Sequence, residues 1–495
     1  MIRIAVPALA VIALGGCLLQ SAAAQTPVQI SPEARSAMEH IAGSILVDGH
    51  AYAYDEQLAD NIGGRLTGSD AYNKGVSWGV EQFKALGLKN VHTESWTIPA
   101  AWEPETLATA EMVEPRHQRL YLESLGWSPS TPDDGVKGRI VYVKDVLHES
   151  ALRAQAAEIK GNIALVDKES LHADGPLPFG VLLNNLNMIG SLGAQALVMG
   201  YGPPNNLLSQ KGLEADGSLS SLPTAGLGNE DTLLIRRLMK QGPVTISFSF
   251  RNKIRKNVQV ENVVAELPGR DDQNEWLLLG GHLDSWHPGT GAQDNGTGVA
   301  SVIETARAII ASGRPPRRTL RFVLFGGEEE GLLGSRAYEK AHSSELPHCD
   351  AVIITDIGAG LPKGWYTFGR DDIKQALSSV EPLLAGLGAS GTNDDNDNFF
   401  DSDHAPFLVQ GIPALFLWPD LTEYSNLHHL PADTFDKVDE RNLNVGTAVL
   451  ALTAYAIADS PTAFAPHLDK QQMESILKNE KVYEQYKDLE KHSML

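Results

Sequence analysis

Side chains that bind metal ions follow several apolar, strand-like runs in the second half of this 495-residue sequence. The set comprises His282 and Asp284 after WLLLGG, Asp294 in GTGAQDNGTG, Glu328, Glu329 and Glu330 after RFVLFGG, Asp356 after AVIIT, and His429 in HHLPADT. Each residue alone has an ordinary structural explanation, such as a satisfied histidine, a helix N-cap or a solvated charge run. In α/β sheets, however, ligands bind beyond the carboxyl ends of the strands, and these residues all fall at strand exits or in nearby loops. Their coincidence predicts one shared metal site.

The types of these side chains indicate which metal the site would hold. Two imidazoles and three carboxylates make a nitrogen and oxygen ligand set that suits zinc, with manganese and cobalt as alternatives. Five ligands are too many for one tetrahedral zinc, and they suit two ions ~3.5–4 Å apart that share one carboxylate. With His282 as a ligand, Asp284 is placed to accept its other ring N–H and to fix the ring orientation. A cysteine-based zinc knuckle is excluded, because the sequence holds only Cys17 and Cys349.

An alternation of strands and helices from Asn257 onward must position these residues. Predicted strands lie at 258–269, 275–285, 318–327, 351–355 and 412–418, and predicted helices at 298–311, 332–341 and 373–387. This alternation predicts an α/β fold with a mixed, mostly parallel sheet flanked by helices. Further helices are expected at 31–58 and 72–86, with the glycine-rich stretch GGRLTGSDAYNKG between them.

Residues 120–250 differ in character from the rest, because short β-rich runs alternate there with turn residues. We expect this block to be a β-rich domain inserted into the α/β domain that carries the metal site. The predicted division is a signal peptide over 1–24, the main domain over 25–119 and 251–462, the insert over 120–250 and a charged, amphipathic C-terminal helix within 463–495.

The amino terminus has the pattern of an export signal. Arg3 precedes an apolar run at 4–14, and SAAAQ offers a small-residue cleavage site after Ala24. We therefore expect an exported, periplasmic or extracellular protein, with a lipoprotein acylated at Cys17 as the alternative. No later segment is apolar enough to span a membrane. The net charge of −22 argues against partners such as nucleic acid or anionic lipid.

Five segments, taken in order, resemble the motifs of the co-catalytic di-zinc exopeptidases of the aminopeptidase type. They are GGHLDSW, GAQDNGTG, FVLFGGEEEGLLGS, ITDIGAGLPKG and HHLPADT. The resemblance covers about residues 258–458, and residues 120–250 look like the protease-associated domain that such enzymes insert. The roles it implies are a bridging carboxylate for Asp294, one zinc site completed by His282 and Asp356, a second completed by Glu329 and His429, and a general base for Glu328.

Two of these assignments choose between neighbouring residues. The family motif has two glutamates, one variable residue and then a Gly-Leu segment, so the resemblance makes Glu330 the variable position. The family also has an Asp-Thr pair four residues after the ligand histidine. Asp433-Thr434 stands at that distance from His429, which is therefore preferred to His428.

The resemblance implies a zinc-dependent exopeptidase that hydrolyses small peptides, dipeptides among them, and that forms a homodimer. In the implied mechanism, two zinc ions lower the pKa of a water, and Glu328 carries its proton to the leaving amine. An aminopeptidase that trims longer peptides is the near alternative. The loop residues Tyr424, Asp403 and His404 are expected near the cleft, where each has either a substrate-binding or a structural role.

Two other members of the wider superfamily are disfavoured. A non-catalytic protein of the transferrin-receptor type would lack some of the ligands, whereas all five ligand positions and the base are filled here. A glutaminyl cyclase uses a single zinc, which the full two-metal set argues against.

Overall fold

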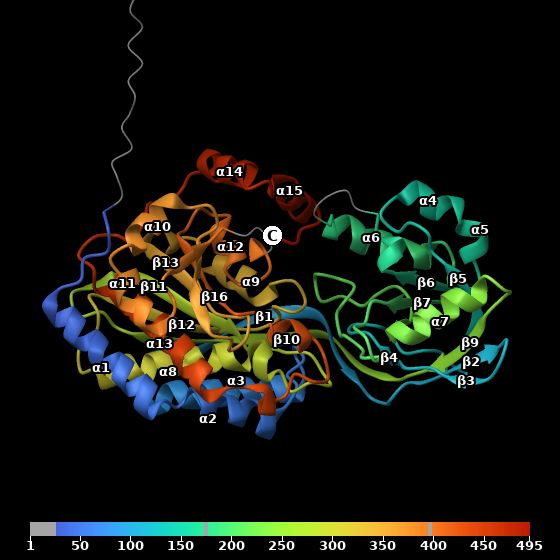
Figure 1. Ribbon diagram of the computed structural model, residues 1–495, viewed down its shortest axis with the longest axis horizontal. Helices are drawn as coiled ribbons and strands as arrows, with labels where there is room; N and C mark the ends of the chain where they lie inside the picture. Colours follow the sequence, from blue (N-terminus) through green and yellow to red (C-terminus); the bar gives the residue numbers. More distant parts are fainter. Residues whose placement is uncertain (1–25, 173–176, 395–397) are drawn as a thin grey trace, which may run out of the picture.

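Two adjoining α/β units, each built on an eight-stranded sheet, make up the described part of the chain (Figure 1). The computed structural model describes residues 26–172, 177–394 and 398–495. The predicted signal peptide and Cys17 lie outside these residues. Within the described ranges, no helix has both the length and the apolar character needed to cross a membrane.

The first sheet carries the residues predicted to bind metal. Its strands lie in the order β1 (Lys89–Pro104), β10 (Asn252–Leu267), β12 (Arg318–Phe325), β11 (Asp272–His282), β13 (Cys349–Ile354), β16 (Ala414–Pro419), β14 (Pro362–Tyr366) and β15 (Gly391–Asn393). The central strands β12, β11, β13 and β16 run parallel, whereas β10 and β14 join them antiparallel. The predicted mixed sheet in an α/β fold is confirmed.

Helices cover both faces of this sheet, because its central strands are apolar on both sides. In β11, Leu277 and Leu279 belong to one buried core, and Trp276 and Leu278 belong to another. The first core is closed by α1 (Pro32–Asp48), α2 (Ala51–Glu56), α3 (Asp70–Ala85), α8 (Thr297–Ala311), α10 (Asp371–Leu377), α11 (Glu381–Leu384) and α13 (Glu440–Asp459). The second is closed by α9 (Leu333–Ala341), α12 (Ala405–Leu408), α14 (Lys470–Asn479) and α15 (Tyr483–Lys491).

The second sheet lies to the right of the first in Figure 1 and has its own apolar core. Its strands follow the order β3 (Gln118–Arg119), β2 (Thr109–Glu114), β9 (Thr245–Ser249), β5 (Val136–Tyr142), β6 (Ile163–Asp167), β7 (Ala196–Gly200), β8 (Thr224–Leu227) and β4 (Leu122–Ser124). The helices of this unit are α4 (Glu149–Ala154), α5 (Ala156–Ile159), α6 (Phe179–Ser191) and α7 (Asn229–Met239). Because β2 pairs with β9, the unit begins before the expected boundary at residue 120.

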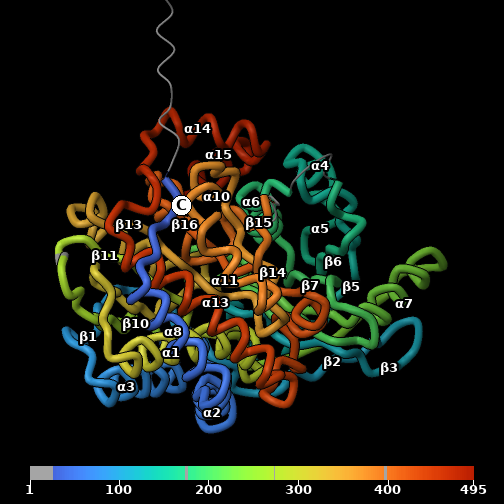
Figure 2. The backbone as a smooth tube through the Cα atoms, turned by 60° about the vertical axis from the view of Figure 1, so that its left-hand side comes forward, coloured from blue at the N-terminus to red at the C-terminus, as the bar shows by residue number. Residues whose placement is uncertain are grey.

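Three predicted helices are interrupted in the structure. The segment over 31–58 breaks at Gly49, which has an extended backbone and no room for a Cβ beside the Ile45 carbonyl. The segment over 373–387 divides into α10 and α11. The segment over 469–495 is two helices, α14 and α15, separated by Lys481 with a φ of 62°. A left-handed residue of this kind ends a helix and redirects the chain, so α15 turns toward α6 (Figures 1 and 2).

Candidate metal centre

The carboxyl ends of β11, β12 and β13 bring the predicted ligands to one edge of the first sheet. His282 ends β11 and lies opposite Phe325, the last residue of β12, so the three glutamates follow at the same edge. Ile354, the last residue of β13, pairs with Gly280 and places Asp356 next to His282. Parallel strands thus gather side chains that lie far apart in the sequence.

His282 is the centre of the first group of potential ligands. Its Nε2 atom lies 2.7 Å from Asp356 Oδ1, 3.2 Å from Asp294 Oδ1 and 3.9 Å from Glu328 Oε2. The imidazole is 1% exposed. These four side chains are close enough for their oxygen and nitrogen atoms to surround a cation.

His429 is the centre of the second group. Its Nε2 atom lies 2.9 Å from Glu329 Oε2 and 3.4 Å from Asp294 Oδ2. Asp294 therefore turns one carboxylate oxygen toward His282 and the other toward His429, as a carboxylate between two cations would. The neighbouring His428 also approaches Asp294 Oδ2, at 3.6 Å, but its side chain is 47% exposed, compared with 21% for His429.

Asp284 contacts His282 in a different way from the one that the sequence predicts. His282 Nδ1 lies 3.0 Å from the main-chain carbonyl of Asp284, whereas the nearest carboxylate oxygen is 3.8 Å away. The carboxylate instead accepts the main-chain N–H groups of Glu328 and Glu329, at 3.4 and 3.2 Å. Asp284 thus orients the histidine through its backbone and the glutamate loop through its side chain.

Two buried residues to which the sequence assigned no role at the site hold the loop containing Asp294. Asp433 accepts the main-chain N–H groups of Gln293 and Asp294, at 2.7 and 3.1 Å. Arg65, from the segment GGRLTGS, is fully buried and donates to the carbonyls of Leu283, Gly63, Thr290 and Gly291 at 2.7–3.1 Å. This guanidinium ties the end of β11 to the glycine-rich loop, which only a planar group with several donors can do.

The electrostatics of the cluster test whether cations fit it. Burial raises the pKa of Glu328 and Glu329 well above the ordinary value, and repulsion from Asp356 and Asp294, respectively, raises it further. Although burial alone would lower the pKa of His282, the carboxylates of Asp356 and Glu328 raise it well above its usual range. Glu329 Oε1 is buried and has no hydrogen-bond partner in the described part of the chain. Crowded, buried carboxylates need opposing charge, which bound cations would supply, so these residues fit a metal pair.

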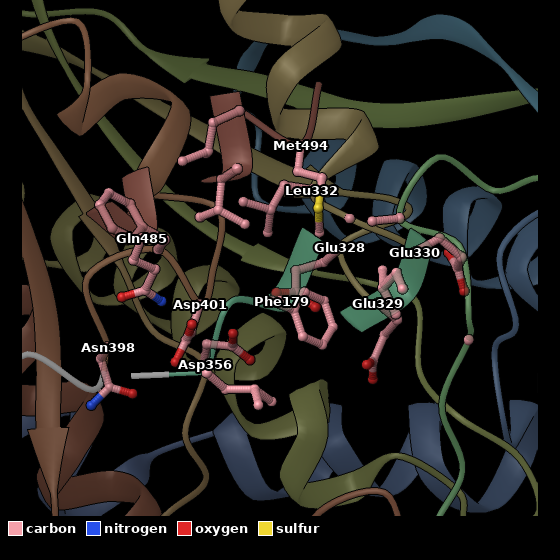
Figure 3. Close-up of a pocket in the computed structure, with 18 of the residues that line it drawn as sticks. Phe179, Glu328, Glu329, Glu330, Leu332, Asp356, Asn398, Asp401, Gln485 and Met494 are labelled. Atoms are coloured by element: carbon pink, nitrogen blue, oxygen red, sulfur yellow. The ribbon is translucent and has the colours of Figure 1, made fainter. Parts of the chain in front are cut away.

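A cavity of about 800 Å³ opens onto these residues. Asp294, Glu328, Glu329, Asp356 and His429 all line it, and Figure 3 shows Glu328, Glu329 and Asp356 among its walls. Its size lies within the range of about 300–1,000 Å³ that is typical of small-ligand sites. The candidate ligands are therefore accessible to a small molecule.

The remaining residues expected near the cleft fall into different environments. Tyr424 lines the cavity and stacks on His428, with 5.1 Å between the ring centroids. Asp403 and His404 are both fully buried. The His404 ring stacks between Phe368 and Phe416, and burial lowers its pKa to about 3, so it is a neutral core residue.

Residues 262–454, which contain every predicted ligand, match peptidase family M28. The chain carries a peptidase family M28 domain. This match agrees with the clusters of histidine and carboxylate groups at the strand ends. Together with the relatives described next, it makes the protein a hydrolytic metallopeptidase of the exopeptidase type.

Similarity to known proteins extends well beyond the M28 domain. The chain is 28% identical to carboxypeptidase Q of Bos taurus over 415 residues, which is 81% of this chain and 84% of the relative. It is 25% identical to aminopeptidase YwaD of Bacillus subtilis over 422 residues, which is 82% of this chain and 84% of the relative. The crystal structure of a peptidase M28 precursor from Shewanella amazonensis superposes with a TM-score of 0.77 at 28% identity, covering 88% of this chain and 99% of that one.

Proposed function

We propose that this protein is a di-zinc exopeptidase that hydrolyses small peptides, dipeptides among them. The observation that carries the proposal is the position of Asp294, whose two carboxylate oxygens face His282 and His429. Each histidine has a second carboxylate within 3 Å, from Asp356 and Glu329, respectively. This arrangement supports the proposal of two neighbouring cation sites that share Asp294.

The donor set favours zinc over harder cations. Each half of the site offers one imidazole nitrogen and carboxylate oxygens, which are ligands that zinc binds well and that magnesium and calcium rarely combine. When bound, the two ions would acidify a water and polarise the peptide carbonyl. The protein's own contribution is to hold the ligands, to position the peptide and to move protons.

Glu328 is proposed as the group that moves the proton. Unlike Glu329, it makes no close contact with His429, and its carboxylate lies on the cavity wall beside His282 and Asp356. Its main-chain N–H donates a hydrogen bond to Asp284, which fixes the position of the Glu328 backbone. Burial raises its pKa, which makes the carboxylate a stronger base for taking a proton from a water and passing it to the leaving amine.

An aminopeptidase that shortens longer peptides is the second candidate. Similarity to aminopeptidase YwaD over 82% of this chain supports it, just as similarity to carboxypeptidase Q supports the leading candidate. The two functions differ in whether the enzyme requires both ends of the peptide close to the scissile bond. A substrate series that varies the length and the blocking group separates them.

The test combines metal analysis with such a series. We expect elemental analysis of the purified protein to find two zinc ions per chain, and free dipeptides to be hydrolysed faster than amino-blocked dipeptides or tetrapeptides. Negligible zinc together with no hydrolysis would reject the proposal. Stepwise release of amino-terminal residues from tetrapeptides, at rates equal to those for dipeptides, would favour the aminopeptidase instead.

The protein's surroundings and assembly follow from the sequence pattern and the resemblance. We infer export through residues 1–24, with anchoring through Cys17 as the alternative, an inserted protease-associated domain over 120–250, and a homodimer. Mass spectrometry of the mature amino terminus distinguishes cleavage after Ala24 from acylation at Cys17. Light scattering measures the oligomeric state.

A further inference from the structure

One wall of the substrate cavity is built by residues outside the matched M28 region of 262–454. Phe179 and Leu183 come from α6 of the second unit, whereas Val482, Leu489 and Met494 come from the last segment of the chain. All five side chains are apolar. They line the same cavity as Glu328 and Asp356, and Figure 3 draws Phe179 and Met494 with these carboxylates.

Phe179 differs from the other apolar residues of this wall because a substantial part of it is exposed. Its side chain is 41% exposed, although Leu183, one turn later on α6, is 8% exposed. A large aromatic ring that lines a cavity and stays exposed offers apolar contact to whatever binds there. Its position at the start of α6 places this surface at the border between the two units.

The last segment of the chain holds α6 in place and spans the cavity. Asp488 of α15 accepts the main-chain N–H of Gly180 at 2.7 Å, next to Phe179. The contact is close, because a Cβ on Gly180 would lie 2.3 Å from the His492 ring. Beyond α15, the Ser493 carbonyl accepts a hydrogen bond from Arg336 of α9 at 2.5 Å. Residues 483–495 thus form a strap from α6 to α9, which Figures 1 and 2 show beside α6.

We propose that Phe179 and this strap determine specificity by limiting the enzyme to short peptides and favouring an apolar side chain next to the scissile bond. The inference rests on the proposed exopeptidase function. A peptide whose carbonyl lies near Glu328 can place a flanking side chain along this wall, since both line one cavity. In this proposal the strap stops a longer peptide from extending past the cavity, because residues of the strap line that cavity.

Two variants test the two parts of the wall, and a third serves as a control. Phe179→Ala removes the exposed ring, and Asp488→Ala releases α15 from Gly180. Leu233→Ala, on α7, removes a side chain of similar exposure (44%) that does not line this cavity. Phe179→Leu keeps an apolar surface at the same position. Melting curves confirm that each variant is folded.

The readout is kcat/KM for Leu-Leu, Ala-Ala and tetra-alanine with the zinc-loaded enzyme. For Phe179→Ala we expect about a 10-fold loss on Leu-Leu and less than about a 2-fold loss on Ala-Ala. Phe179→Leu should retain most of the preference, and Leu233→Ala should match the wild type. For Asp488→Ala we expect the ratio of tetra-alanine to Ala-Ala turnover to rise about 10-fold.

The possible failures have distinct meanings. If the zinc-loaded wild type hydrolyses none of these peptides, the proposed function itself is rejected. If the wild type is active but Phe179→Ala lowers Leu-Leu and Ala-Ala turnover equally, or Asp488→Ala leaves the length ratio unchanged, the specificity wall is rejected and the exopeptidase function stands.

Discussion

Replacing Glu328 with glutamine keeps the size of the side chain but removes its ability to take up a proton. General acid–base catalysis contributes about 10²–10⁴ in rate, so we expect kcat to fall by that factor, or about 3–5 kcal/mol in the barrier. Zinc content should be retained, because the closest contacts of His282 and His429 are with other carboxylates, at 2.7 and 2.9 Å. Glu328 itself lies 3.9 Å from His282 Nε2.

The adjacent glutamates provide matched comparisons within the segment GGEEEG. Glu329 lies 2.9 Å from His429 Nε2, and its other oxygen is unpartnered among the described residues, so Glu329→Gln should lose metal as well as turnover. Glu330 is 2% exposed, and burial together with repulsion from Asp284 raises its pKa well above the ordinary value. A raised pKa favours the protonated, neutral acid, which a glutamine side chain resembles. Glu330→Gln should therefore change the metal content and the turnover little.

The assay measures zinc per chain by elemental analysis and dipeptide hydrolysis under saturating zinc for all three variants. We expect a full metal load with lost turnover for Glu328→Gln, a reduced load for Glu329→Gln, and nearly normal values of both for Glu330→Gln. An inactive Glu330→Gln beside an active Glu328→Gln would refute this assignment of roles to the three glutamates.

Three further predictions concern the support of the site and its electrostatics. Arg65→Lys should destabilise the fold by at least about 3 kcal/mol, because a lysine leaves several of the four bonded carbonyls without donors. Thermal unfolding measures this loss of stability, and an unchanged Tm would contradict the prediction. Asp433→Asn should weaken zinc affinity about 10–100-fold in a chelator competition, since an amide has one acceptor oxygen for the two N–H groups of residues 293 and 294. Burial lowers the pKa of Lys211 to about 8, whereas its value in the unfolded chain is near 10.5. Between these two pH values the unfolded state therefore binds more protons than the folded state. Because of this difference, the contribution of Lys211 to the free energy of unfolding rises with pH. In urea unfolding, Lys211→Met should therefore be more stable than the wild type at pH 7 by about 1–3 kcal/mol and should lose this advantage by pH 10; equal stability at both pH values would argue against a buried charge.

Local sequence patterns located the strands and the candidate ligands because both have short-range signatures. Apolar runs such as AVIIT occupy buried central strands, and the residues directly after them must lie at the strand exits. His282, Glu328 and Asp356 meet there because their strands are parallel neighbours. The same reasoning did not identify α13, since that helix is buried nearly all round and has no polar face to give a helical period.

Support from distant segments had no such signature. Arg65 stands alone in a glycine-rich turn, and nothing near it in the sequence indicates that it binds carbonyls more than 200 residues away. In the sequence, Asp433 only marked the motif position four residues after His429. In the structure, its carboxylate accepts hydrogen bonds from the loop that contains Asp294. The sequence predicts that Asp284 supports His282. It does not indicate that the backbone carbonyl of Asp284 contacts the histidine while its carboxylate binds the glutamate loop, because that depends on the local geometry.

The sequence by itself determined the chemical identity of the site: the imidazoles, the carboxylates and their order along strands whose exits share one edge. Only the tertiary structure decided that Asp294 faces both histidines, that Glu330 is buried, and that Phe179 and the C-terminal residues Leu489 and Met494 line the same cavity as the candidate ligands. The physical reason is the range of the interactions. Periodicity and turn chemistry act within a few residues, whereas the walls of the cavity form when helices remote in the chain pack together and exclude water from a shared core.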